Sequence, residues 1–234
     1  MPFSKILQLY LPSLFPLSAY EEFVEAVRAM TDSYSDSRRE FDGASNLIGW
    51  RFRTCVEDKE SYMASWRQYG ADVSFDALYE RERLLFGTFV SGVSCIEAAV
   101  YACYALASHP KTLHLNFDVS VRRYRSGPKH FLKALKGTGR TLALVPVMEG
   151  LVSSDEWAVW TGFRNTMTHR SDLPRINYGA VGGPAPQANP LEFAATWSSK
   201  ALSGDEVAFG ELIDWLASRL EAILRAGSML STGA

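Results

Sequence analysis

Residues 75–108 read FDALYERERLLFGTFVSGVSCIEAAVYACYALAS, and this stretch decides the fold. It contains no proline, and between Leu84 and Ala107 its only charged residue is Glu97. A run of this length could cross a bilayer, but its glycines and serines dilute the hydrophobicity, and a carboxylate near the middle is costly in lipid. We therefore predict the central helix of an all-α bundle, whose small residues let neighbouring helices approach closely. In that setting Glu97 is expected to be buried.

The composition is that of an ordinary globular protein. Of 234 residues, 47% are apolar and 21% are charged, so neither wholesale disorder nor a fibrous repeat is indicated. The formal net charge of -2 gives no general attraction to nucleic acid. Any such binding must therefore come from basic residues that cluster locally.

The cysteines and the N-terminus indicate a cytoplasmic protein. Cys55, Cys95 and Cys103 are an odd number at no metal-ligand spacing, and the last two are expected to pack as small hydrophobes in a reducing setting. Residues 1–18 are apolar but broken by prolines, and they lack a basic segment and a small-residue cleavage site. We therefore expect no signal peptide.

No pattern predicts a metal or cofactor site. His109, His114 and His130 have no neighbours at zinc-ligand spacing and are expected at the surface or in loops. The sequence also has no phosphate-binding glycine loop and no nucleophile elbow. We predict no metal ion and no cofactor.

The N-terminal third is expected to be an extension, residues 1–74, packed on a helical domain of residues 75–227, so that the chain forms one globular unit. The sequence SAYE, at the start of residues 18–31, has the pattern of a capping box and predicts a short amphipathic helix. Residues 32–46 are rich in Ser, Asp, Arg and Gly and predict a loop. Residues 47–69 leave helix and strand open.

Further helices are predicted on the C-terminal side of the central run. A short helix is expected over residues 128–137, between a proline and a glycine, and another over residues 142–151 despite Pro146. The capping box SGDE at residues 203–206 begins a final helix that ends near Gly227, and a frayed tail is expected after it. The apolar stripe of this helix is Val207, Phe209, Leu212, Ile213, Leu216, Leu220 and Ile223.

Two segments lie between these helices. Residues 171–200 are rich in glycine and proline and predict a long loop, in which residues 176–178 and 193–197 could pair as a small β-hairpin. The segment after Asp118 is basic, with no acidic residue until Glu149.

The sequence RNTMTH, residues 164–169, lies at the end of a helix that Ser153 or Ser154 is expected to cap. Trp160, Phe163 and Met167 fall on one side of this helix and define its core-facing stripe, with Trp157 at the edge. The opposite face is polar and consists of Thr161, Asn165, Thr166, Thr168 and His169, with Arg164 at its border. A solvated face would be richer in Glu and Lys.

Arginine and histidine together can hold a phosphate and move a proton near neutral pH, which is what RNA cleavage requires. Asn165 precedes His169 by one helical turn and could orient the ring. Arg164 and His169 are separated by roughly 140° in a straight helix, so their convergence needs the length of arginine or a break in the last turn. The alternative is structural: Arg164 pairs with Glu97, and His169 interacts with carbonyls at the helix end.

This segment resembles the HEPN superfamily of all-α ribonucleases and nucleotide-binding proteins, whose signature is Arg, a polar residue that is commonly Asn, three further residues and then His. Arg164, Asn165 and His169 match that signature, and the apolar helix with Glu97 is similar to the central helix of the family. The resemblance covers residues 75–226. It implies metal-independent RNA cleavage at a dimer interface, with Arg164, Asn165 and His169 as catalytic residues. Glu97, Thr168 and Arg170 are expected to support them.

The basic segment is a candidate RNA-binding surface. Its candidate contacts are Arg122, Arg123, Arg125, Lys129 and Lys133, followed by Lys136 and Arg140. They are interleaved with Tyr124, His130 and Phe131, a mixture that could follow an RNA backbone. A solvated helix face is the alternative.

Two functional hypotheses follow. The first is a cytoplasmic HEPN-like endoribonuclease, a toxin or defence effector, which is active as a homodimer and is controlled by an antitoxin or other regulatory protein. It would leave 2′,3′-cyclic phosphate and 5′-hydroxyl ends. The second is a non-catalytic helical module that binds a nucleotide, RNA or a protein partner. Neither hypothesis involves a membrane.

Overall fold

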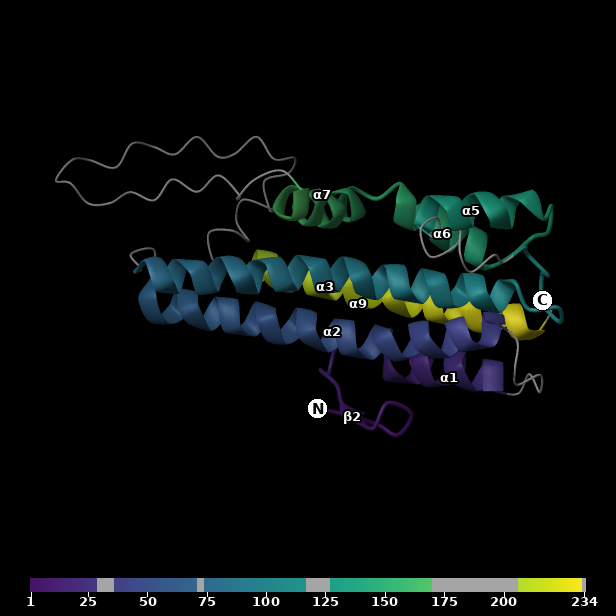
Figure 1. The fold of residues 1–234 in the computed structure, drawn as a ribbon, viewed down its shortest axis with the longest axis horizontal. Helices are drawn as coiled ribbons and strands as arrows, with labels where there is room; N and C mark the ends of the chain where they lie inside the picture. Colours follow the sequence, from purple (N-terminus) through teal and green to yellow (C-terminus); the bar gives the residue numbers. More distant parts are fainter. Residues whose placement is uncertain (29–35, 71–73, 117–126, 170–205, 233–234) are drawn as a thin grey trace.

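The structure is a computed structural model, and it describes residues 1–28, 36–70, 74–116, 127–169 and 206–232 (Figure 1). The helices are α1 (Leu17–Arg28), α2 (Asp36–Tyr69), α3 (Phe75–Ala107), α5 (Pro128–Gly137), α6 (Leu144–Val152), α7 (Asp155–His169) and α9 (Glu206–Ser228). A short 3₁₀ helix, Met229–Thr232, follows α9, and β1 (Phe3–Ser4) pairs antiparallel with β2 (Leu9–Tyr10). The described part of the chain is therefore all-α apart from this small pair of strands, as predicted.

The helix predicted over residues 75–108 is confirmed as α3. Its N-cap is Ser74, whose Oγ accepts a hydrogen bond from the backbone N–H of Ala77 at 3.3 Å. At 33 residues α3 is roughly 50 Å long. Helix α2 packs along it as the other arm of an antiparallel hairpin, and α9 and α7 also pack on α3. The central run of the sequence is thus the central helix of the fold.

The prediction of a loop over residues 32–46 is wrong, because α2 is already helical at Asp36 and continues to Tyr69. Two kinds of contact stabilise this polar part of the helix. Arg38 forms an ion pair with Asp42 one turn later at 3.1 Å, and the Tyr101 hydroxyl of α3 donates a hydrogen bond to Glu40 at 2.6 Å. Composition predicted a loop here because these contacts depend on α3 as well as on local sequence.

Among the described helices, α3 is long and apolar enough to cross a membrane. However, 61% of its most apolar window is buried inside the fold. Among the described residues, its apolar surface is covered mainly by α2, α7 and α9. This burial is what the core-helix interpretation predicts.

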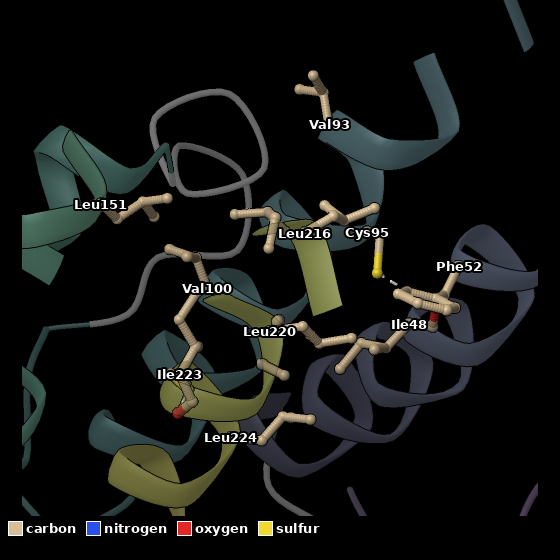
Figure 2. Packing of buried hydrophobic residues seen from close by; sticks show 14 of the residues in the cluster. Ile48, Phe52, Val93, Cys95, Val100, Leu151, Leu216, Leu220, Ile223 and Leu224 are labelled. Carbon is tan, nitrogen blue, oxygen red and sulfur yellow. Dashed lines mark hydrogen bonds between the residues drawn. The ribbon is translucent and has the colours of Figure 1, made fainter. Parts of the chain in front are cut away.

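Three helices pack together around the middle of the core. Figure 2 shows Ile48 and Phe52 from α2, Cys95 and Val100 from α3, and Leu216, Leu220, Ile223 and Leu224 from α9. The Cys95 thiol donates to the carbonyl oxygen of Ile48 at 3.4 Å. Cys55 and Cys103 are also buried and unoxidised, and burial raises the pKa of all three thiols. The thiols therefore serve as packing groups, as predicted, and are poor nucleophiles.

Helices α5, α6 and α7 lie on one side of α3, opposite α2 (Figure 1). The bounds of α5 match the prediction, and α6 forms despite Pro146, which lies in its first turn where no intrahelical N–H bond is lost. Ser154 caps α7, since its Oγ accepts from the backbone N–H of Trp157 at 3.2 Å. These three predictions are confirmed.

Aromatic packing fixes α7 on α3. Phe89 stacks on Phe163 with ring centroids 4.5 Å apart and meets Trp160 edge-to-face at 5.0 Å. Gly92, one turn further along α3, lies directly against the Trp160 ring, because an added Cβ would overlap it. The small-residue close approach predicted for the central helix is therefore present between α3 and α7.

Several smaller predictions at the helix ends are wrong. Helix α1 already includes Leu17, so Ser18 lies inside its first turn and hydrogen-bonds Glu22 at 3.0 Å instead of capping the helix. Val207 is exposed, although the rest of the predicted α9 stripe is buried. The expected frayed tail is instead a 3₁₀ helix through residue 232, where Leu230 is buried because it packs on the core. The predicted β-hairpin and the first three residues of the SGDE capping box lie outside the described residues.

Asp58 is a carboxylate in the α2–α3 interface, facing Gly87 so closely that a Cβ there would overlap it. Partial burial raises the pKa of Asp58 above its usual 3.8, although nearby Arg83 opposes the shift. The folded protein therefore binds this proton more tightly than the unfolded chain does. The resulting stabilisation is complete below pH 3.8 and is lost as pH rises through the folded-state pKa.

Asp58→Asn is therefore expected to raise the melting temperature at pH 7, because the neutral amide does not carry the burial penalty of a carboxylate, and to give a smaller gain near pH 4. Thermal unfolding followed by circular dichroism at both pH values measures this. Asp214→Asn, at an exposed carboxylate on α9, is the matched control and should change the melting temperature little at either pH. A lower melting temperature for Asp58→Asn at pH 7 would show that the carboxylate is stabilising.

Candidate functional site

The predicted motif lies in the last turns of α7. Asn165 and Thr168 are exposed, and the Thr168 hydroxyl donates to the backbone oxygen of Arg164 at 2.6 Å. Thr166 is buried, which corrects its assignment to the polar face: it follows Phe163 by three residues and so shares its core-facing side. Thr168 therefore acts on the local backbone, while Asn165 is available to a ligand.

Helix α7 remains helical through His169, so there is no break in its last turn. The backbone positions of Arg164 and His169 therefore face directions roughly 140° apart. The side chain of His169 and the whole of Arg170 lie outside the described parts of the chain. Any convergence of the two motif residues requires the reach of the side chains or a second copy of the chain.

Arg164 forms an ion pair with Glu97 of α3, with Nη2 and Oε1 3.2 Å apart. The pairing is the one expected under the structural alternative, but the predicted burial of Glu97 is wrong. The side chains of Arg164 and Glu97 keep 29% and 38% of their surface exposed. The Arg164 Nε is buried and has no hydrogen-bond partner among the described residues. The guanidinium is thus positioned by Glu97 while part of it stays open to solvent.

An open cleft of about 380 Å³ lies beside this ion pair, between α5 and α7 on the surface of α3. Each of the three helices contributes polar side chains to it. These side chains are Glu97 from α3, Lys129 and His130 from α5, and Thr161, Arg164 and Asn165 from α7. The apolar part of the wall is formed by Val152, Trp157 and Ala158 together with Pro128. The structure therefore brings Arg164 and Asn165 together with Glu97, as expected, and adds two residues of the basic segment.

The basic segment is only partly described. Arg122, Arg123 and Arg125 lie outside the described residues. Lys129 lines the cleft, whereas Lys133 is exposed one turn further along α5 and does not line it. Phe131 is buried in the core, so it cannot stack on a nucleic-acid base, contrary to the expectation for this segment.

The sequence predicted His130 to be a surface or loop histidine within the basic segment, and it gave no indication that this residue lies beside Arg164. It is exposed, as expected, but it lines the same cleft as Arg164. The available signal was its place in the first turn of a proline-started helix, which does not identify the neighbouring helix. His114 is exposed as predicted, and His109 is buried, which corrects its expected surface position: its Nδ1 accepts from the backbone N–H of Lys111 at 3.2 Å.

Comparison with protein-family models, with curated proteins and with solved structures finds no match. The geometry around Arg164 is therefore the basis for a functional proposal.

Proposed function

We propose that this chain is a HEPN-type endoribonuclease that cleaves RNA without a metal ion. The observation that supports the proposal best is the position of Arg164: Glu97 orients its guanidinium at the edge of an open cleft that also contains Asn165 and Lys129. A partly exposed guanidinium in the same cleft as an amide and a lysine suits a phosphate oxygen.

In this proposal the RNA supplies its own nucleophile. His169 takes the proton of a ribose 2′-hydroxyl, and the 2′-oxygen attacks the adjacent phosphorus. The bond from phosphorus to the 5′-oxygen breaks, and the imidazolium formed at His169 returns its proton to that oxygen, which leaves as a 5′-hydroxyl, so the other product ends in a 2′,3′-cyclic phosphate. Arg164 stabilises the charge that develops on the phosphoryl oxygens, and Asn165 orients the reacting groups.

The proposed active form is a homodimer in the cytoplasm. Because α7 is regular through His169, the histidine of one protomer and the arginine of its partner can face each other across a two-fold axis more readily than two residues of one helix. The corresponding biological roles are those of a toxin or defence effector held in check by an antitoxin or other regulatory protein.

A non-catalytic module that binds a nucleotide, RNA or a protein partner is the second candidate. The observation that favours it is the regular helix through His169, because it leaves the backbone positions of Arg164 and His169 roughly 140° apart, so the cleft can bind a ligand through Arg164 without bringing the imidazole to it. Such a module would bind ligand through the cleft without turnover.

Incubation of the purified protein with structured RNA in excess EDTA tests the proposal. We expect cleavage that is unchanged by the chelator, because no step assigned to this site uses a metal ion. Parallel thermal unfolding with the same RNA measures binding. Thermal stabilisation without any cleavage would favour the binding module, and cleavage abolished by EDTA would contradict the proposed chemistry.

A further inference from the structure

The cleft contains more anion-binding groups than the α7 motif supplies. Lys129 is exposed and, among the described residues, has no acidic partner. His130 follows it in the first turn of α5 and adds an imidazole to the same wall. The acidic residue that lines the cleft, Glu97, is already paired with Arg164. The cationic groups from two separate helices therefore outnumber the carboxylate between them.

The start of α5 adds to this positive character. Its N-cap is Gly127, which has no side chain to cap the helix, and Gly127 and Pro128 both line the cleft. The positive end of the α5 dipole therefore borders the cleft, and no capping carboxylate or hydroxyl neutralises it. This end alone would not define a site, but here it joins Lys129 on its own helix and Arg164 on another.

The cleft also has room and neutral surface for the rest of a nucleotide. Its volume of about 380 Å³ falls within the usual range for small-molecule sites. Thr161 and Asn165 can hydrogen-bond ribose hydroxyls, while Val152 and Trp157 offer apolar surface to a base. The Thr161 hydroxyl donates to the backbone oxygen of Trp157 at 2.8 Å, which leaves its oxygen free to accept.

We propose that this cleft is a nucleotide subsite, in which Lys129 and Arg164 hold the phosphate next to the scissile linkage and His130 donates a hydrogen bond to it. The inference rests on the proposed function, since it names the part of the RNA that this site would grip. It assigns a binding role to Lys129 and His130, which lie outside the Arg-Asn-His motif.

Calorimetric titration with adenosine 3′-monophosphate, compared with adenosine, tests the subsite. We expect Lys129→Ala to raise the Kd for the nucleotide roughly fivefold or more, because it removes a cation from the phosphate. His130→Ala should weaken binding in the same direction, and neither change should alter the Kd for adenosine. Lys133→Ala is the matched control. Lys133 lies one turn further along α5, where it is exposed to solvent but does not line the cleft. Its replacement should change the Kd for the nucleotide by less than about twofold.

Equal effects of Lys129→Ala and Lys133→Ala would overturn the subsite, and so would equal affinity for the nucleotide and for adenosine. His169→Ala separates this inference from the proposed function, because it should lower the cleavage rate by roughly 100-fold or more and leave the Lys129-dependent binding intact. Nucleotide binding that depends on Lys129 in a protein that never cleaves RNA would retain the subsite and reject the ribonuclease. Cleavage of RNA with no dependence on Lys129 would support the ribonuclease and reject the subsite.

Discussion

Replacing His169 by alanine is expected to lower the rate of RNA cleavage by roughly 100-fold or more, because proton transfer by a positioned side chain contributes about that much. The melting temperature should stay close to that of the wild type, since His169 is the last residue of α7 and alanine is compatible with a helix end. Single-turnover cleavage of a labelled RNA in EDTA measures the rate. Arg164→Ala should be similarly impaired.

The matched control for His169→Ala is His114→Asn. His114 is an exposed histidine with a positive φ of 52°, a backbone conformation that asparagine tolerates better than alanine. It does not line the cleft beside Arg164, and its substitution should leave cleavage unchanged. Arg164→Ala also leaves Glu97 without its ion-pair partner and could lower the stability of the fold. The cleavage rate of this variant is therefore compared with that of the wild type per molecule of folded protein. A His169→Ala protein with more than about a tenth of wild-type activity would contradict the general-base assignment.

Gly92→Ala is expected to destabilise the fold by about 1–3 kcal/mol, the usual cost of adding a methyl group to a packed interior. The added Cβ would overlap the Trp160 ring, with Cη2 at 2.8 Å. The ring cannot move aside easily, because Trp160 is fully buried and meets Phe89 edge-to-face. For a chain of this size the melting temperature should fall by roughly 3–10 °C. Since α7 carries Arg164, cleavage should fall as well.

Gly162→Ala is the control for this prediction, because Gly162 lies on α7 next to the same interface but has no atom within 4 Å of an added Cβ. Its expected effect is a gain of about 0.5–1 kcal/mol, from the better helix propensity of alanine. Chemical denaturation of both variants measures the difference. Equal stability of the two variants would show that α7 does not pack on α3 through Gly92.

Much of the fold could be predicted because it follows from local rules. The length of the apolar run predicted α3, and a proline and a glycine marked the two ends of α5. A serine followed by two acidic residues predicted the start of α7. The first turns of α2 could not be predicted, since helix there is stabilised by the contact of Glu40 with Tyr101, 61 residues away. A polar composition without that contact is typical of a loop.

The site could be predicted only as far as it lies on one helix. The Arg164–Glu97 pair was foreseeable because both residues stand out as charges on otherwise apolar or neutral faces. Lys129 and His130 could not be placed beside them, because in the described structure α5 and α7 are brought together through their packing on α3 and α6. Such a cleft is a property of tertiary packing. Hydrophobic periodicity predicts which face of a helix is buried, but it does not predict which other helix packs against that face.

In the proposed mechanism, a guanidinium and an imidazole at the end of α7 cleave RNA through its own 2′-hydroxyl. Identifying the ends of the RNA products by mass spectrometry, after cleavage by the wild-type protein in EDTA, tests it most directly. We expect 2′,3′-cyclic phosphate and 5′-hydroxyl ends, and no cleavage at a nucleotide whose 2′-hydroxyl is methylated. Products with 3′-hydroxyl and 5′-phosphate ends, or cleavage at the methylated nucleotide, would contradict it.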